Sequence, residues 1–282
     1  MTEPALAPDL IAGLKQADPD RYLSVLYAPE DKRADLMALY AFNAEIAGVR
    51  DRIHEPLPGE IRLQWWRDVL ASNDENACGG HPLATALIRT IRRHKLPLSA
   101  FDNYLEARIF DLYDDPMPSR GDLEGYLGET ASALIQLAAL ILDNGAAGQV
   151  AEMSGHAGCA QGIAGLLCLL PQHRSRGQCY IPRDLLAAAG TTPEVLISGN
   201  DKAATARAIA AMVALGREHQ TKFEAQATRL PASLRAAFLP AALTGRYLGA
   251  VEQLGAKAAT QSARIGAISR HWALFRTAAQ GW

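Results

Sequence analysis

Apolar residues recur at three- and four-residue steps along most of this 282-residue chain, which is the spacing of one face of an α-helix. The stretch 36–51, LMALYAFNAEIAGVRD, shows the pattern: positions 36, 39, 40, 42, 46 and 49 are apolar or aromatic. We therefore predict a helix here with one buried face. No run alternates with a period of two, and no repeat of fixed length occurs. The pattern predicts an all-α bundle of many helices.

Prolines, glycines and capping residues divide this pattern into predicted helices. The sequence predicts short helices over 8–17 and 19–28, then a long helix from Pro29 through residue 51. It predicts a turn over 54–59 and loops over 73–80 and 171–177. The other expected helices cover 60–72, 81–95, 99–113, 122–142, 146–170, 202–228 and 232–254, with a short one after Pro182 and a last one ending near residue 279. Because 146–170 is rich in glycine and alanine, we expect close helix packing there.

The composition is that of an ordinary globular protein, with 49% hydrophobic residues, 21% charged residues and a net charge of −2. We expect one domain over 1–282, with a short tail over 1–7, and no nucleic-acid partner. The N-terminus lacks the features of a signal peptide. The apolar run 131–142 is shorter than the about 20 residues that span a bilayer. At most, peripheral contact with a membrane is expected.

The cysteines show no CxxC motif and no paired metal-ligand spacing; they are Cys78, Cys159, Cys168 and Cys179. We expect reduced and mostly buried thiols, which favours a cytoplasmic location. The basic residues at 92–95 suit the negative end of a helix dipole better than a phosphate site.

Two aspartates offer the best metal spacing. Asp111 and Asp115 could share a helix face and hold Mg²⁺, but Pro116 ends that helix and makes an ordinary turn the favoured interpretation. His156 and His173 have no Glu or Cys at ligand spacing, so a zinc site is not favoured. No nucleophile elbow surrounds Ser24, Ser154 or Cys168.

Aromatic and basic residues mark two candidate surfaces. Arg62, Trp65, Trp66 and Arg67 form a candidate partner surface, and since adjacent helical residues point about 100° apart, one tryptophan should be in the core. Near the C-terminus, one face carries Ile265, Ile268, Trp272 and Phe275, with Arg264, Arg270 and Arg276 interspersed. Such a helix could lie on an anionic membrane. We favour the alternative, a last core helix whose arginines reach out to water.

Residues 21–254 resemble the squalene/phytoene synthase family. RYLSVLYAPEDKRADLMALYAF matches its first helices, with Arg33 and Tyr40 at family positions. Two further segments match; their family positions are Asp111, Leu123, Glu124, Tyr126 and Ala131 in the first, and Arg176, Tyr180 and Asp184 in RGQCYIPRDLL. The resemblance implies an isoprenoid-synthase-like bundle with a central apolar cavity, and Mg²⁺-dependent head-to-head prenyl transfer.

The departures fall on the two aspartate-rich boxes that hold Mg²⁺ in this family. The first box reads AGVRD, so that Ala47 replaces a carboxylate while Asp51 remains. The second box falls on Leu169 and His173. The resemblance therefore implies degraded metal boxes, no catalytic residues and no cofactor. The alternative is a prenyl-diphosphate transferase whose altered Mg²⁺ site uses Asp51, Asp111 and Asp115.

LYAFNAEIAGVRD followed by IRLQWWRD is most similar to a divergent branch of the family, the assembly factors of respiratory complex I. Asn43 and Glu45 follow the Ala-Phe pair, as they do in that branch. This resemblance implies a non-catalytic scaffold that binds a complex I subunit or assembly intermediate, with a cavity that could retain an isoprenoid or lipid. The expected location is the cytoplasm, including the inner face of the membrane.

Overall fold

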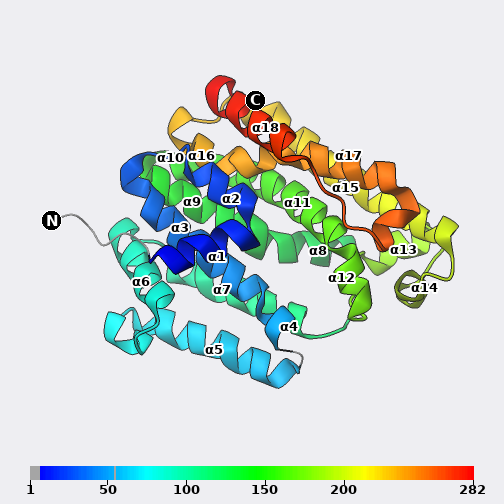
Figure 1. The fold of residues 1–282 in the computed structure, drawn as a ribbon, viewed down its shortest axis with the longest axis horizontal. Coiled ribbons are helices and arrows are strands. Elements are labelled where there is room, and N and C mark those ends of the chain that lie inside the picture. The colour runs from blue at the N-terminus through cyan, green and yellow to red at the C-terminus, as the bar shows by residue number, and fades with distance from the viewer. Residues whose placement is uncertain (1–6, 54) are drawn as a thin grey trace. The chain divides into compact units, whose positions relative to one another are not determined.

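The computed structural model describes residues 7–53 and 55–282, and every regular element among them is helical (Figure 1). The prediction of an all-α bundle is confirmed. The central cavity stays a prediction. Apart from Ala7, the expected tail over 1–7 lies outside the described residues, as does His54.

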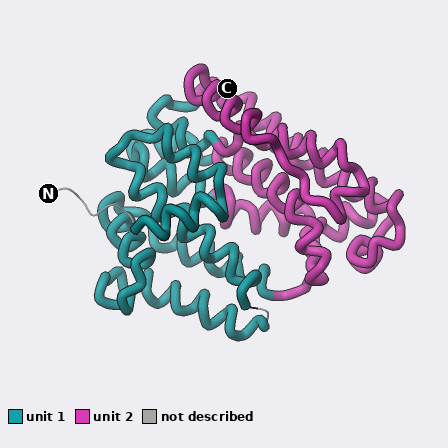
Figure 2. Tube along the Cα trace, in the orientation of Figure 1, with its two compact units in different colours: residues 1–112, 133–151, 230–239 teal, residues 113–132, 152–229, 240–282 magenta. Residues whose placement is uncertain are grey.

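The chain forms two compact units, each assembled from three separate stretches (Figure 2). Unit 1 contains Met1–Leu112, Ala133–Ala151 and Leu230–Leu239, and unit 2 contains Tyr113–Ser132, Glu152–Arg229 and Pro240–Trp282. The chain passes between the two units several times, so the division does not fall at a single point in the sequence that a change in composition could mark. The expectation of a single domain stays a prediction.

Unit 1 is built around one long helix, α3. Its elements are α1 (Pro8–Ala17), α2 (Pro19–Val25), α3 (Glu30–Ala47), α4 (Val49–Arg52), α5 (Pro56–Ser72), η1 (Glu75–Cys78), α6 (Pro82–His94), α7 (Leu98–Arg108), η2 (Ile109–Leu112), α9 (Ala133–Leu142), α10 (Asn144–Ala147), η4 (Gly148–Val150), η5 (Ala232–Leu234) and α16 (Arg235–Phe238).

The middle of helix α3 is buried on all sides, because the helix packs against α1, α2, α6, α7 and α9. Every residue from Asp35 to Asn43 is buried. The sequence expectation of a single buried face is therefore wrong for this part of the helix. The expected continuation through residue 51 is also interrupted: α3 ends before Gly48, and α4 is a separate short helix.

Burying α3 also buries the carboxylate of Asp35, whose residue is only 4% exposed. Thr90 donates to it at 2.9 Å, Arg93 at 3.0 Å, and His94 Nε2 lies 2.8 Å away. A buried charge of this kind is tolerated only when paired and hydrogen-bonded. Arg93 and His94, at the end of α6, therefore stabilise this carboxylate as well as the helix terminus.

Unit 2 contains the small-residue helix α11 and the longest helix, α15. Its elements are α8 (Arg120–Leu127), the π-helical turn η3 (Gly128–Ser132), α11 (Ala151–Cys168, whose first residue belongs to unit 1), α12 (Leu170–Ser175), α13 (Arg183–Ala188), α14 (Pro193–Ser198), α15 (Lys202–Ala227), η6 (Leu239–Leu243, from Pro240), α17 (Thr244–Leu254), η7 (Gly255–Ala259) and α18 (Ala267–Gln280).

Two predicted boundaries are wrong because proline is compatible with a helix's first turn, where its missing N–H costs nothing. Pro56 and Pro171 each lie in the first turn of a helix, α5 and α12, where the sequence predicts a turn and a loop. By contrast, the helix expected over 232–254 is broken into η5, α16, η6 and α17. Pro240 lies at this break.

The helical run Arg120–Leu142 is long and apolar enough to cross a membrane by length and composition alone. Core helices pass the same test, and 56% of its most apolar window is buried. The run therefore has the burial of a core helix.

Helix α11 passes very close to the turn η3. A Cβ added at Gly158 would lie 2.5 Å from the Ser132 backbone nitrogen, whereas one added at Gly165 of the same helix would meet nothing within 4 Å. The expectation of close packing along this glycine-rich segment is confirmed at Gly158.

We predict that Gly158→Ala destabilises the protein by about 1–3 kcal/mol, because the backbone of η3 cannot move aside as a side chain could. The matched control Gly165→Ala should be neutral or gain up to about 1 kcal/mol, since alanine is the better helix former. Urea unfolding followed by circular dichroism measures both. Equal effects of the two substitutions would contradict the close contact.

Candidate functional site

In unit 1, Asn43 is part of a polar chain. It lies four residues before Ala47, which the family resemblance assigns to the first metal box. The Tyr104 hydroxyl donates to Asn43 Oδ1 at 2.9 Å, and Arg108 Nε donates to the same hydroxyl at 3.2 Å. Arg108 also pairs with Asp111 at 2.9 Å. The chain links α3 to α7 and η2, and burial raises the pKa of Tyr104. Asp111 is thus engaged by an arginine of its own unit.

A second polar cluster surrounds Glu45, which lies two residues after Asn43 on α3. Its Oε1 accepts from Arg62 at 2.5 Å and from the indole Nε1 of Trp66 at 3.1 Å. Arg62 Nη2 lies 3.2 Å from His81 Nε2, and its guanidinium lies 4.6 Å from the centre of the Trp65 ring. The cluster joins α3 to α5 and to the start of α6.

These contacts correct the predicted partner surface. Trp66 is fully buried, so it is the core tryptophan and cannot meet a partner. Arg67 pairs with Asp102 at 2.9 Å and with Glu106 at 2.7 Å, and Arg62 serves Glu45. Trp65 is half-buried under Arg62. The side chains on α5 that are strongly exposed and apolar are instead Leu57 and Ile61.

The other predicted positions of unit 1 have mainly structural surroundings. Arg33 Nε donates to the Ala28 carbonyl at 2.9 Å, which fixes the link between α2 and α3. Tyr40 is buried beside the Arg21 guanidinium, and burial raises its pKa to about 12, so the phenol stays protonated. Asp51 lies exposed on α4.

In unit 2, three of the predicted positions come together. The Tyr180 ring lies 4.6 Å from His173 and 6.0 Å from Tyr126, measured between ring centres. The positive φ of Gly177, +76°, lets the chain turn back after α12, where the Gln178 amide donates to the His173 carbonyl. Arg176 precedes this turn.

Two predicted aspartates of unit 2, Asp184 and Asp115, lie at its surface. Asp184 accepts from the backbone amide of Arg120 at 3.0 Å, so it holds the start of α8. Asp115 is exposed ahead of α8.

The residues at the metal-box positions do not fit Mg²⁺, which prefers several hard oxygen ligands. Ala47 and Leu169 offer no ligand atom, and His173 is packed against a tyrosine ring. Within residues 7–53 and 55–282, no three His, Cys, Asp or Glu side chains form a group that could hold a metal ion.

Sequence reasoning missed a chain of three side chains in unit 2. His219 Nε2 lies 3.0 Å from Glu124 Oε1, and its Nδ1 lies 3.1 Å from His156 Nδ1. With the carboxylate fixing the proton on His219 Nε2, its Nδ1 accepts and His156 Nδ1–H donates. The three residues lie on α8, α11 and α15, far apart in sequence, so no spacing signal could have found them.

The C-terminal helix α18 exposes the face that the sequence analysis favoured as buried. Ile268 is 88% exposed, Trp272 61% and Phe275 55%, whereas Ala273 and Leu274 on the other side are buried. The favoured core-helix interpretation is therefore wrong for this stripe. Helix α18 has two apolar faces. The face with Ala273 and Leu274 packs against unit 2, and the face with the larger side chains is exposed.

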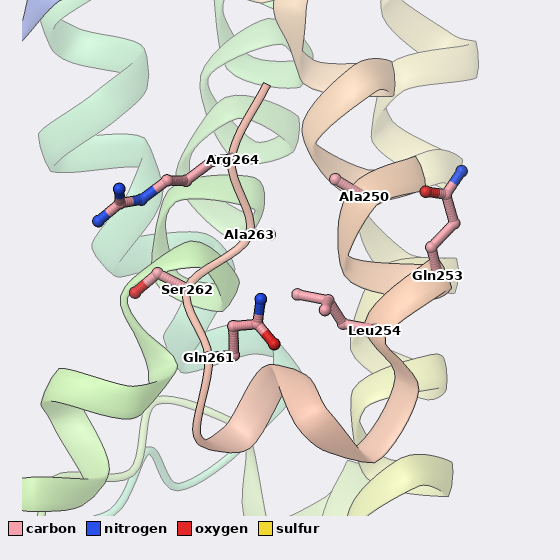
Figure 3. A pocket seen from close by; sticks show the side chains of 7 residues that line it. All are labelled: Ala250, Gln253, Leu254, Gln261, Ser262, Ala263 and Arg264. Atoms are coloured by element: carbon pink, nitrogen blue, oxygen red, sulfur yellow. The ribbon is translucent and has the colours of Figure 1, made fainter. Parts of the chain in front are cut away.

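One open pocket of about 450 Å³ lies in unit 2, between α17 and the extended segment that follows η7 (Figure 3). Its lining includes Leu254, Gln253, Gln261, Ser262 and Arg264. No lining residue comes from α11, so this pocket is not the apolar central cavity implied by the family resemblance.

The cysteines do not line this pocket. Cys78, Cys159 and Cys179 are buried as expected, and Cys168 is half-buried.

We predict that Glu45→Ala lowers the free energy of unfolding by about 2–4 kcal/mol, because it leaves the buried Trp66 N–H without its acceptor and Arg62 without its partner. The control is Glu106→Ala, which breaks the exposed ion pair with Arg67 and should cost less than about 1 kcal/mol. Chemical unfolding compares the two. A loss for Glu45→Ala no larger than the control's would argue against the cluster.

A pH dependence follows from His156. Burial, then the neighbouring His219 and Lys222, lower its pKa below the ordinary 6.5. As the pH falls, His156 therefore takes up a proton in the unfolded chain before it does so in the folded protein. The stability that the neutral His156 contributes above about pH 6.5 is lost as the pH falls toward its pKa in the folded protein. His156→Asn, which keeps a donor without titrating, should flatten the stability profile between about pH 7.5 and 5.5. The exposed His271→Asn is the control, and an identical slope in both variants would refute the assignment.

Comparison with known proteins matches the squalene/phytoene synthase family model over residues 14–269. A rat protein named "NADH dehydrogenase (ubiquinone) complex I, assembly factor 6" is 30% identical over 249 residues, which cover 86% of this chain and 72% of the rat protein. The human protein of that name is 31% identical over 66% of this chain and 56% of its own length.

Solved structures of enzymes share the fold at low identity. A dehydrosqualene synthase in complex with ligand has a TM-score of 0.78 and 14% identity, covering 96% of this chain and 94% of that one. Squalene synthase HpnC from Alicyclobacillus acidocaldarius has a TM-score of 0.72 and 20% identity, covering 88% and 93%. The family model and the rat relative each span most of the chain, and the isoprenoid-synthase-like fold agrees with both. The chain therefore belongs to the squalene/phytoene synthase family.

Proposed function

We propose that this protein is a non-catalytic assembly factor for respiratory complex I, which works by binding a protein partner, such as a complex I subunit or assembly intermediate. The observation that carries the proposal is the similarity, over most of the chain, to relatives named as complex I assembly factor 6. Fold alone does not distinguish this role from synthesis, because the structural neighbours include squalene and dehydrosqualene synthases.

The residues at the family's metal positions support a role without Mg²⁺. Prenyl transfer needs carboxylates that hold Mg²⁺ against a leaving diphosphate. Alanine, leucine and histidine stand at 47, 169 and 173, and Asp111 is paired with Arg108 at 2.9 Å. On this proposal the protein is a pseudoenzyme that requires no cofactor.

The two residues shared with the assembly-factor branch give the proposal a structural basis. Asn43 and Glu45 each anchor a polar cluster that ties α3 to neighbouring helices. Asn43 and Glu45, which lie close to position 47 in sequence, thus stabilise the bundle. On this proposal the protein acts by binding a partner at its surface. The cytoplasmic location, the retained isoprenoid or lipid cavity and the identity of the partner stay predictions.

Deletion of the gene in its own host should lower membrane NADH:quinone activity and the abundance of assembled complex I. Complementation with the wild type, and equally with Asp51→Asn, should restore both, because the exposed Asp51 has no metal to bind on this proposal. Unchanged complex I, together with altered squalene, carotenoid or hopanoid content, would overturn it.

A second experiment tests the enzyme alternative directly. Incubation of the purified protein with farnesyl or geranylgeranyl diphosphate and Mg²⁺ should release no diphosphate above a protein-free blank, while a dehydrosqualene synthase serves as the positive control. Release that disappears in Asp51→Asn or Asp111→Asn would establish a prenyl-diphosphate transferase with an altered metal site.

A further inference from the structure

The exposed stripe of α18, formed by Ile268, Trp272 and Phe275, is a continuous apolar surface. At about 100° per residue, the three side chains fall within about 60° of one another around the helix. The rings of Trp272 and Phe275 lie 6.1 Å apart, measured between centres. Single exposed apolar residues are ordinary, but aromatic and aliphatic side chains gathered on one helix face indicate an interaction surface.

The stripe cannot turn inward, because the opposite side of α18 is fixed to unit 2. Leu274 and Ala273 are buried, and Arg270 donates to the Tyr247 hydroxyl on α17 at 3.2 Å. Just beyond the helix, the Trp282 ring meets Phe223 of α15, with 5.2 Å between ring centres. The exposed apolar surface is therefore a stable feature of this unit.

The segment that carries the stripe has formal charges of one sign. Residues 253–282 contain no Asp or Glu, although the whole chain carries a net charge of −2, and their cations are Lys257, Arg264, Arg270 and Arg276. Lys257, Arg264 and Arg276 are exposed and make no ion pair within the described part of the chain. Around the helix, Arg276 lies about 40° beyond Trp272, and His271 lies about 40° beyond Phe275 on the other flank.

We propose that α18 docks on the surface of an anionic lipid bilayer, with the stripe inserted between the headgroups and the flanking cations against lipid phosphates. An apolar face containing Trp and Phe, bordered by Arg, is the arrangement of helices that lie in a membrane interface. The exposed cations of this segment, Lys257, Arg264 and Arg276, are complementary to an anionic surface. The inference does not rest on the role in complex I assembly.

Helix α5 of unit 1 provides a matched surface that lacks this complementarity. Ile61 is 62% exposed and Leu57 67%, exposed fractions within the range of the three stripe residues. However, Glu55, Glu60 and Asp68 lie on or just before the same helix. A lipid with anionic headgroups should therefore distinguish α18 from α5.

Flotation of the purified full chain with vesicles tests the proposal. The wild type should float with vesicles that contain phosphatidylglycerol, should float poorly with pure phosphatidylcholine, and should detach as salt is raised. The double variant Ile268→Glu/Phe275→Glu should lower the bound fraction about tenfold, whereas Ile61→Glu should leave it unchanged. Arg264→Gln/Arg276→Gln should weaken binding to anionic vesicles only. Thermal unfolding confirms that each variant is folded.

A spectroscopic readout avoids any effect of the charged substitutions on folding. Tryptophan emission should shift to the blue when the wild type meets phosphatidylglycerol vesicles, and Trp272→Phe should bind but lose this shift. Absence of wild-type flotation, equal binding by the Ile268→Glu/Phe275→Glu variant, or an unaltered shift in Trp272→Phe would overturn the proposal. So would sedimentation showing a dimer that the same double variant converts to monomer, because the stripe would then be covered by a second copy.

Discussion

The burial of α3 is the constraint on which unit 1 depends. A helix surrounded by five neighbours must satisfy every polar side chain it carries, because an unpaired buried charge or amide costs several kcal/mol. Asp35 finds its partners on α6, Asn43 on α7, and Glu45 on α5. Each of these polar residues is therefore paired with a side chain on one particular neighbouring helix.

The same constraint bears on function. Catalytic groups must point at a substrate, and the residues that hold them must support that orientation. In unit 1, the Arg62, Arg67 and Arg108 guanidinium groups are each directed at a carboxylate of their own unit. These polar side chains therefore contribute to the internal stability of unit 1.

Unit 2 shows the opposite distribution on α18. There the polar and charged side chains form a border, and three large apolar side chains face outward. Exposing this area to water is unfavourable at roughly 25 cal/mol per Å². Exposed apolar patches of this kind commonly mark interaction sites.

Local sequence patterns predicted much of the fold. Helical periodicity and caps located α1, α6 and α15 within a residue or two, since these depend on interactions within one turn. The family motifs named Tyr126 and Tyr180, and only the structure shows that their rings lie near each other. Proline was a poorer guide, because Pro171 is compatible with a helix start.

Only the tertiary structure decided which faces are buried and which polar groups meet. Periodicity shows that α18 has apolar residues, but Ala273 and Leu274 already satisfy its packing, so the larger stripe remains outside. Likewise, Trp65 and Trp66 are indistinguishable in sequence, and the acceptor Glu45 on α3 determines which one is buried. The chain of Glu124, His219 and His156 joins three helices. Contacts between residues so far apart are set by packing geometry, which one sequence does not record.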